Sequence, residues 1–161
     1  MTIQVGDKIP SVTLKQMTSE GPKDITTDEL FRGKKVALFA VPGAFTPACS
    51  QRHLPGFVDR ASDIKAKGID EIVCVAVNDI FVMTAWGKEQ KADGKVRMLA
   101  DGSGDFVRAL GLDLDLSKMG LGTRSKRYSI LVDNGVVKSL NVEQQPGQVE
   151  ASGADAMLRA L

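Results

Sequence analysis

The chain has 161 residues, of which 43% are apolar and 25% charged, a composition typical of one soluble domain rather than of a disordered chain. Its 21 Lys and Arg nearly balance its 20 Asp and Glu, so it lacks the basic excess of a nucleic-acid binder. One histidine and two cysteines are too few for a four-ligand Cys/His metal site, so we expect no metal. The length predicts a single domain over residues 1–161.

Short apolar runs alternate along the chain with longer amphipathic stretches. The apolar runs predict strands at residues 36–41, 71–77, 96–100, 128–132 and 136–142. The amphipathic stretches predict helices at residues 46–67, 79–90, 153–161 and, after a turn at 101–104, through residue 110. Asp133-Asn134-Gly135 separates the last two strands and is a strong hairpin signal.

The order of these elements predicts the fold class. Strands alternate with helices and the chain then continues into a hairpin, which indicates a mixed β-sheet flanked by helices. The strands are apolar throughout (residues 71–77 read EIVCVAV), and this is the pattern of a sheet that is covered on both faces. We therefore predict an α/β fold.

The segment 42–50, PGAFTPACS, carries the strongest chemical signal. It lies where the first central strand is expected to end and a long helix to begin, and α/β sheets bind ligands at that end of their strands. If Thr46 is the N-cap, Pro47 occupies the first helical position and Cys49 lies in the first turn. A thiol there is close to free backbone N–H groups and to the positive end of the helix, and such thiols ionise readily.

Two interpretations of Cys49 follow from these residues alone. A reactive thiolate also needs hydrogen-bond donors and a cation to stabilise the charge that develops during reaction, for which loop amides, the Thr46 hydroxyl and an arginine are candidates. The alternative is a common Thr-Pro helix cap followed by an inert buried cysteine.

A longer pattern around this cysteine resembles a known family. Pro42-x-x-x-Thr46-x-x-Cys49 is similar to the peroxidatic motif of the peroxiredoxins, and the string VPGAFTPACSQRHLPGF is similar to their type II, peroxiredoxin-5-like branch. The resemblance runs from residue 5 nearly to the C-terminus. It includes the stretches 77–79, 85–87, 99–101 and 126–128.

The resemblance implies a thiol-dependent peroxidase that reduces hydrogen peroxide and organic hydroperoxides in antioxidant defence and redox homeostasis. Cys49 would attack the O–O bond and become a sulfenic acid. Thr46 would hydrogen-bond sulfur and peroxide, Pro42 would shield the sulfenic acid, and Arg127 would be the active-site arginine. Gly43, Phe45 and His53 would belong to the substrate pocket.

The resemblance also implies a thioredoxin-like fold and no cofactor, because sulfur is the redox centre. The Cys-x-x-Cys signature of dithiol oxidoreductases is absent from the sequence. Relatives in this family often form homodimers across the active-site loops, and we expect a homodimer here.

The reductant is the point on which members of the family differ. One branch carries a resolving cysteine near the C-terminus, where this chain has Ala151. Cys74 lies in an apolar run, and we read it as a core residue rather than a resolving one. We expect an external thiol, glutathione with glutaredoxin, as the reductant. The alternatives are thioredoxin with Cys74 as the resolving cysteine, and a redox sensor that is not efficiently recycled.

His53 leads to a rival hypothesis from another enzyme class. It follows Cys49 by four residues, so the two could form the Cys–His pair of a cysteine hydrolase. The peroxidase is preferred because no hydrolase signature surrounds the cysteine.

The expected compartment follows from the N-terminal residues, the length of the apolar runs and the number of cysteines. The N-terminal residues MTIQVGDKIP lack the pattern of a secretory signal, and the longest apolar run, residues 36–41, is far shorter than the roughly 20 residues of a membrane helix. A chain with two cysteines and no export signal is expected in the reducing cytoplasm. We expect no association with a membrane.

Overall fold

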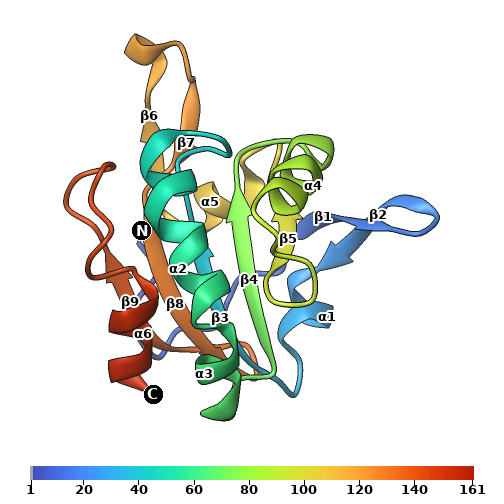
Figure 1. Ribbon diagram of the computed structural model, residues 1–161, viewed down its shortest axis with the longest axis vertical. Coiled ribbons are helices and arrows are strands. Elements are labelled where there is room, and N and C mark those ends of the chain that lie inside the picture. Colours follow the sequence, from blue (N-terminus) through green and yellow to red (C-terminus); the bar gives the residue numbers. More distant parts are fainter. Residues whose placement is uncertain (1) are drawn as a thin grey trace.

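Three of the predicted apolar runs form parallel neighbours at the centre of a seven-stranded sheet in the computed structural model, which describes residues 2–161 (Figure 1). They are β3 (Lys35–Ala40), β4 (Glu71–Ala76) and β5 (Arg97–Ala100). In β3 and β4 every residue after the first is buried, because helices cover both faces of the sheet. The fold is the α/β fold predicted from the order of the elements, in the thioredoxin-like form that the family resemblance implies.

Antiparallel strands complete the sheet on both sides, so it is mixed. β8 (Tyr128–Asp133) pairs with β3 and with β9 (Val136–Val142), which lies at one edge. Asn134 and Gly135 have φ values of 49° and 82°, as a tight two-residue hairpin turn requires. The strand order is β2-β1-β5-β4-β3-β8-β9.

The other edge is a hairpin that the sequence analysis did not assign. It consists of β1 (Thr13–Thr18) and β2 (Gly21–Thr26), and α1 (Thr27–Phe31) follows it directly. Only one residue of each strand is buried, so both strands lack the apolar runs by which the central strands were recognised. Thr26 caps α1 by accepting a hydrogen bond from the backbone N–H of Glu29.

Helices form a layer on each face of the sheet. One layer contains α2 (Leu54–Asp59), α3 (Ala61–Ala66), α4 (Ile80–Glu89) and α6 (Ala154–Ala160). The opposite layer contains α1 and α5 (Asp105–Leu110). Each layer packs against the sheet through its own apolar cluster, so the sheet separates two cores.

The predicted helix over residues 46–67 is interrupted twice. A π-helix covers Cys49–His53, α2 follows it, and Arg60 separates α2 from α3. Pro55 gives a physical reason for the wide turn, because it has no N–H to donate and its ring would crowd the carbonyl four residues earlier in a regular α-helix. The prediction of one continuous helix was therefore wrong.

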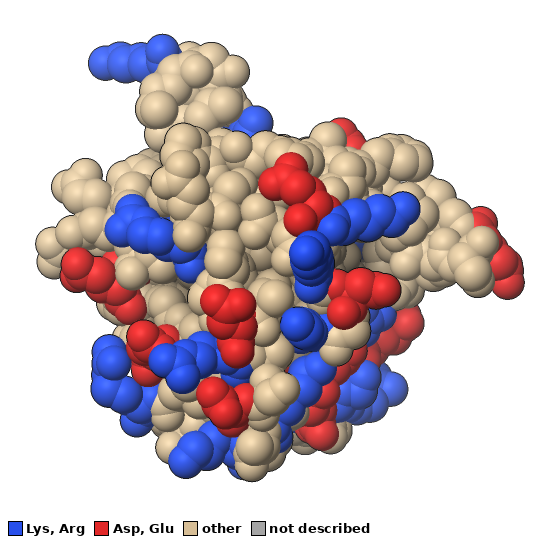
Figure 2. Space-filling model, viewed as in Figure 1, with Lys and Arg blue, Asp and Glu red and all other residues tan. Residues whose placement is uncertain are grey.

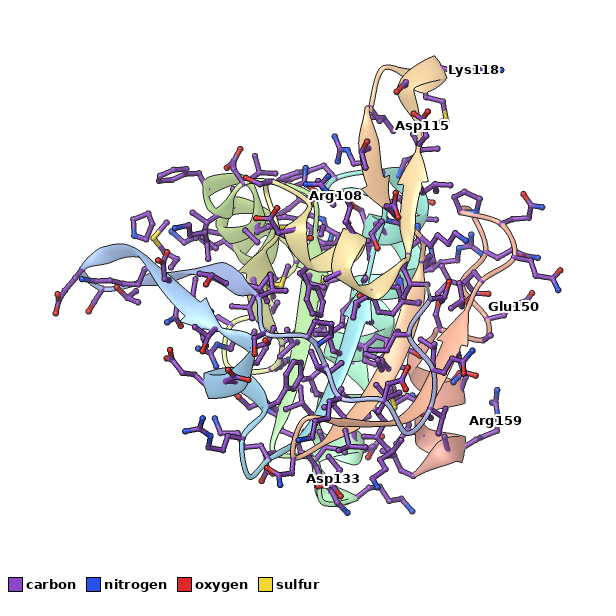
Figure 3. All side chains as sticks on the ribbon, turned by 180° about the vertical axis from the view of Figure 1, so that it is seen from behind. Arg108, Asp115, Lys118, Asp133, Glu150 and Arg159 are labelled. Atoms are coloured by element: carbon purple, nitrogen blue, oxygen red, sulfur yellow. The ribbon has the colours of Figure 1, made fainter. Side chains whose placement is uncertain are left out.

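A small two-stranded ribbon projects from the body beyond the carboxyl ends of the central strands. It consists of β6 (Asp113–Asp115) and β7 (Thr123–Ser125), with a 3-10 turn at Ser117–Met119 (Figure 1). Lys118 lies at its tip, and Asp133 lies at the opposite end of the molecule (Figure 3). On the face shown in Figure 2, basic and acidic side chains are interspersed, with no large patch of one sign. Within residues 2–161, no helix combines the length and the apolar character needed to cross a bilayer.

We predict that the double coverage of the central strands makes them the most sensitive part of the fold. Val73, in β4, is fully buried, so Val73→Ala should lower the free energy of unfolding by about 2 kcal/mol through lost burial and a residual cavity. Val5 is 62% exposed, and Val5→Ala should change it by less than about 0.5 kcal/mol. Urea unfolding measures both, and equal effects would contradict this account of the core.

Candidate active site

Cys49 lies just beyond the carboxyl end of β3, at the start of the helical segment that follows. Helical conformation begins at Pro47, and the Thr46 carbonyl accepts a hydrogen bond from Ser50 N at 2.9 Å. Thr46 therefore occupies the N-cap position that its sequence context predicts. The Cys49 residue has 0% exposure, so its sulfur is enclosed by protein.

Two side-chain donors contact the Cys49 sulfur. Thr46 Oγ1 donates to Sγ at 2.9 Å, and Arg127 Nη2 donates to it at 2.9 Å. Within residues 2–161 no backbone N–H forms a hydrogen bond to this sulfur, although the sequence had pointed to loop amides as donors. Hydrogen bonds to the charged form of a group favour that form, so both contacts stabilise a thiolate over a thiol.

The sheet topology explains why Arg127 reaches Cys49 across a long stretch of sequence. Arg127 directly precedes β8, whose first residue, Tyr128, is paired in register with Ala40 at the end of β3. Because β8 runs antiparallel to β3, its beginning lies at the same edge of the sheet as the start of the Cys49 helix. The two residues therefore meet through the pairing of neighbouring strands.

Arg127 is a buried cation, and all three of its guanidinium nitrogens donate hydrogen bonds. Besides Cys49 Sγ, the acceptors are His53 Nδ1 at 2.9 Å from Nη1 and the Pro146 carbonyl at 2.8 Å from Nε. Arg127 is 2% exposed, and within residues 2–161 no carboxylate forms an ion pair with it. A buried charge without a counter-ion is costly, so this environment favours a thiolate at the sulfur that the guanidinium contacts.

His53 lies against the Arg127 guanidinium, and its expected place in the substrate pocket stays a prediction. It is 0% exposed, and its Nε2 lies 2.9 Å from the Ser152 carbonyl. Burial, and secondarily the charge of Arg127, lower the pKa of His53 to about 3, against the effect of the Ser152 hydrogen bond. A neutral ring with both nitrogens engaged is not placed to take a proton from Cys49, which disfavours a Cys–His hydrolase.

The loop that precedes Thr46 is held closely against Arg124. Pro42 is buried, and its carbonyl accepts a hydrogen bond from Arg124 Nη1 at 3.3 Å. A Cβ atom on Gly43 would lie 2.8 Å from Arg124 Nη1 and 3.2 Å from Thr46 Cγ2, so a side chain there would force Arg124 away. The Gly43 carbonyl lies 2.6 Å from Thr46 Oγ1, so it competes with the Cys49 sulfur for the single proton of this hydroxyl.

Phe45 lies on the outside of this loop. It is 48% exposed and has a φ of 65°, a left-handed conformation that is uncommon for an aromatic residue. Its ring centroid is 6.4 Å from that of Trp86, which donates a hydrogen bond to Ser50 Oγ at 3.0 Å. Phe45 therefore lies at the molecular surface beside Trp86, and its role in a substrate pocket stays a prediction.

Cys74 is a core residue of β4, where its neighbours in register are Phe39 and Met98. It is 0% exposed, and both cysteines of the chain are free thiols. Burial, and secondarily the charge on Cys49, raise the pKa of the Cys74 thiol well above its usual value, while Arg127 opposes this. Cys74 is therefore held as a neutral thiol within the sheet.

The sequence analysis missed the acceptors that orient Arg127 and His53. They are backbone carbonyls of Pro146 and Ser152, in the segment between β9 and α6. Glu143, at the start of that segment, was missed as well, although its carboxylate binds Ser152. Backbone carbonyls leave no residue-type signature, so the sequence carries no signal for the first two.

Comparisons with known proteins agree with this geometry. The Redoxin family model matches residues 4–158. Peroxiredoxin-2E, chloroplastic, of Arabidopsis thaliana is 51% identical over 99% of this chain and 70% of its own length. The reduced Prx3 of Vibrio vulnificus in complex with hydrogen peroxide is 52% identical over 99% of both chains, with a TM-score of 0.94. Peroxiredoxin 5 of Alvinella pompejana is 40% identical, covers 98% of this chain with 97% of its own, and has a TM-score of 0.86.

Family, fold and site geometry thus lead to one assignment. The similarity extends over nearly the whole chain and includes the segment that encloses Cys49. The fold it implies is the one described above. The chain belongs to the redoxin family and is a peroxiredoxin of the type II, peroxiredoxin-5-like kind, a thiol peroxidase of antioxidant function.

Proposed function

We propose that Cys49 is the peroxidatic cysteine and that it reduces hydroperoxides through a sulfenic acid. The observation that carries the proposal is the pair of 2.9 Å hydrogen bonds to Sγ, one from Thr46 and one from the buried Arg127. The similar Vibrio vulnificus protein is described as a complex with hydrogen peroxide, which supports a peroxide as the substrate.

The reaction is a displacement at oxygen. The thiolate attacks the terminal oxygen of a hydroperoxide R–O–OH, the O–O bond breaks, and sulfur keeps the OH group as a sulfenic acid. The leaving oxygen departs with the electron pair of the O–O bond and takes a proton from solvent, which gives water or an alcohol. Negative charge thus moves from sulfur to the leaving oxygen.

Arg127 and Thr46 can donate hydrogen bonds to the sulfur before the reaction and to the peroxide during it. The guanidinium is a fixed donor on the sulfur, and a bound peroxide between sulfur and guanidinium would share its N–H groups. The Thr46 hydroxyl can turn between Sγ and the Gly43 carbonyl, so it can hydrogen-bond sulfur or peroxide. The buried Pro42 would keep water from the sulfenic acid.

We predict that brief exposure to one equivalent of hydrogen peroxide adds one oxygen atom to Cys49 and none to Cys74. The reason is that Cys49 has two donors favouring its thiolate, whereas burial keeps Cys74 neutral. Mass spectrometry after trapping of the sulfenic acid with a diketone reports the site. Cys49→Ser should show no peroxide consumption above background, and an unmodified Cys49 in the wild-type chain would refute the proposal.

We further propose that an external thiol reduces the sulfenic acid, with glutathione and glutaredoxin favoured over thioredoxin. Three features support this. The chain has Ala151 where related enzymes carry a C-terminal resolving cysteine, Cys74 is fully buried in β4, and its thiol is held neutral. Such a thiol cannot attack Cys49 without local unfolding of the sheet. The cycle needs a compartment rich in reduced thiols, for which we propose the cytoplasm.

We predict that Cys74→Ser keeps most of the steady-state peroxidase activity with glutathione and glutaredoxin, within about two-fold of the wild type. Because an external thiol attacks the sulfenic acid, no second cysteine of the chain is needed. Peroxide consumption in parallel assays with each donor system measures this. If Cys74→Ser consumed only one equivalent of peroxide and then stopped, Cys74 would be the resolving cysteine and thioredoxin the favoured donor.

We also propose that the protein is a homodimer that pairs through the end of the molecule that holds Phe45. Large exposed apolar side chains gather at this end. Phe45 follows β3, and Phe81 lies in the first turn of α4, which follows β4, so both lie at the carboxyl ends of parallel strands. Met119 lies on the β6–β7 ribbon, which projects at the same end (Figure 1). Apolar groups gathered on a surface indicate a contact with another molecule.

We predict that Phe45→Asp converts the dimer to a monomer, as measured by light scattering during size exclusion. A charge at the centre of an apolar contact opposes association, and Asp tolerates the left-handed backbone better than Phe does, so the fold should be kept. Val5→Asp is the matched control, since Val5 is also exposed but lies beside β9. A monomeric wild type, or a dimer in both variants, would contradict the proposed interface.

A further inference from the structure

The segment between β9 and α6, residues 143–153, supplies two backbone acceptors to the active site. Its Pro146 carbonyl accepts from Arg127 Nε at 2.8 Å, and its Ser152 carbonyl lies 2.9 Å from His53 Nε2. His53 in turn accepts from Arg127 through Nδ1. This mostly exposed loop, called the β9–α6 loop below, thus determines what the buried guanidinium can bind on the side away from sulfur.

The shape of the β9–α6 loop depends on one carboxylate. Glu143 Oε2 accepts hydrogen bonds from Glu150 N at 2.8 Å, from Ser152 N at 2.7 Å and from Ser152 Oγ at 2.5 Å. The backbone N–H of Glu143 donates to the Arg127 carbonyl at 2.9 Å. Glu143 is therefore hydrogen-bonded through its backbone to Arg127 and through its carboxylate to Ser152, whose carbonyl faces His53.

We propose that Glu143 is a positioning residue of the peroxidase: its carboxylate fixes the Ser152 carbonyl, this carbonyl selects the Nε2–H tautomer of His53, and the free Nδ1 then holds Arg127 with Nη2 on the Cys49 sulfur. This inference rests on the proposed function of Cys49. It adds to that function a set of hydrogen bonds through which an exposed loop sets the orientation of the catalytic cation.

The choice of tautomer follows from counting donors and acceptors. Arg127 has N–H groups and no acceptor, so the His53 nitrogen that faces it must carry a lone pair. The single proton of the neutral ring must then lie on Nε2, where the Ser152 carbonyl accepts it. Without that carbonyl the proton could move to Nδ1, two N–H groups would face each other, and the guanidinium would lose its support.

The pKa shifts of Glu143 and His53 are consistent with a charged acceptor at Glu143 and a neutral ring at His53. Partial burial alone would raise the pKa of the Glu143 carboxyl, but the hydrogen bonds from Ser152 and from the backbone outweigh it, so that this pKa is lowered. Glu143 is therefore ionised at neutral pH. Burial and the charge of Arg127 lower the pKa of His53 to about 3, so its ring is neutral there.

Glu143 acts through hydrogen bonds rather than by pairing with the arginine. Within the described chain no carboxylate forms an ion pair with Arg127. The charged or titratable groups that face Arg127 are Cys49 and His53. A change at Glu143 therefore reaches the sulfur through Ser152, His53 and Arg127.

The test uses one variant series and a local control. Glu143→Ala removes the acceptor, and Glu143→Gln keeps one carbonyl oxygen of similar reach and should restore part of the function. Glu150→Ala is the control, because the Glu150 side chain is exposed at the margin of the molecule and only its backbone N–H, which alanine keeps, bonds to Glu143 (Figure 3). The chain holds one histidine, so nitrogen-edited NMR reports on His53 alone.

Two readouts should move together in Glu143→Ala. The rate constant for reaction with hydrogen peroxide should fall by about 10-fold to 100-fold, the scale of misplacing one catalytic group. The NMR signal of His53 should lose the pure Nε2–H pattern expected of the wild type, and Glu150→Ala should match the wild type in both.

The possible failures can be told apart. If wild-type protein reacts with peroxide at Cys49 while Glu143→Ala keeps the wild-type rate and tautomer, the inference is wrong and the proposed function stands. If the wild type does not react at all, the proposed function is wrong. If Glu143→Ala does not fold, the wild-type spectrum decides alone, because an Nδ1–H or charged ring at pH 7 would overturn the inference.

Discussion

The contact between the buried Arg127 guanidinium and the Cys49 sulfur is the interaction on which the rest of the site depends. A cation with almost no exposure and no carboxylate partner in the described chain needs an acceptor that can carry negative charge, and the Cys49 sulfur is the group that Arg127 Nη2 contacts. The β3–β8 pairing brings the two groups together, and the π-helix that starts at Cys49 places His53 behind the guanidinium.

Much of the fold could be predicted from the sequence where burial leaves a clear pattern. The strands near residues 36–41 and 71–77 were found because both of their faces are covered, and the Asn134-Gly135 turn has the geometry its residues require. The β1–β2 hairpin was not predicted because only one residue of each strand is buried, so neither strand has an apolar run. The π-helix escaped because its cause, Pro55, acts on backbone hydrogen bonds rather than on periodicity.

Part of the candidate site could likewise be predicted from the sequence and part could not. Cys49, Thr46 and Arg127 could be named from residue type and family resemblance, and the structure brings them within hydrogen-bond distance. The predicted pocket roles of His53 and Phe45 stay predictions: the His53 ring is buried against the arginine, and Phe45 is half exposed. The side-chain neighbours of a functional group follow from a motif more readily than its backbone neighbours do, because every residue carries the same carbonyl.

The placement of Cys74 inside β4 limits how much oxidant one subunit can hold. With its second thiol locked in the sheet, the proposed enzyme accepts a single oxidising equivalent per chain and has no internal disulfide in which to store it. When peroxide reacts faster than the donor thiol, the sulfenic acid persists, and a second peroxide molecule can oxidise it to the sulfinic acid, which is essentially irreversible. The supply of small thiols, and not the chemistry at sulfur, would then set how long each molecule survives an oxidative burst.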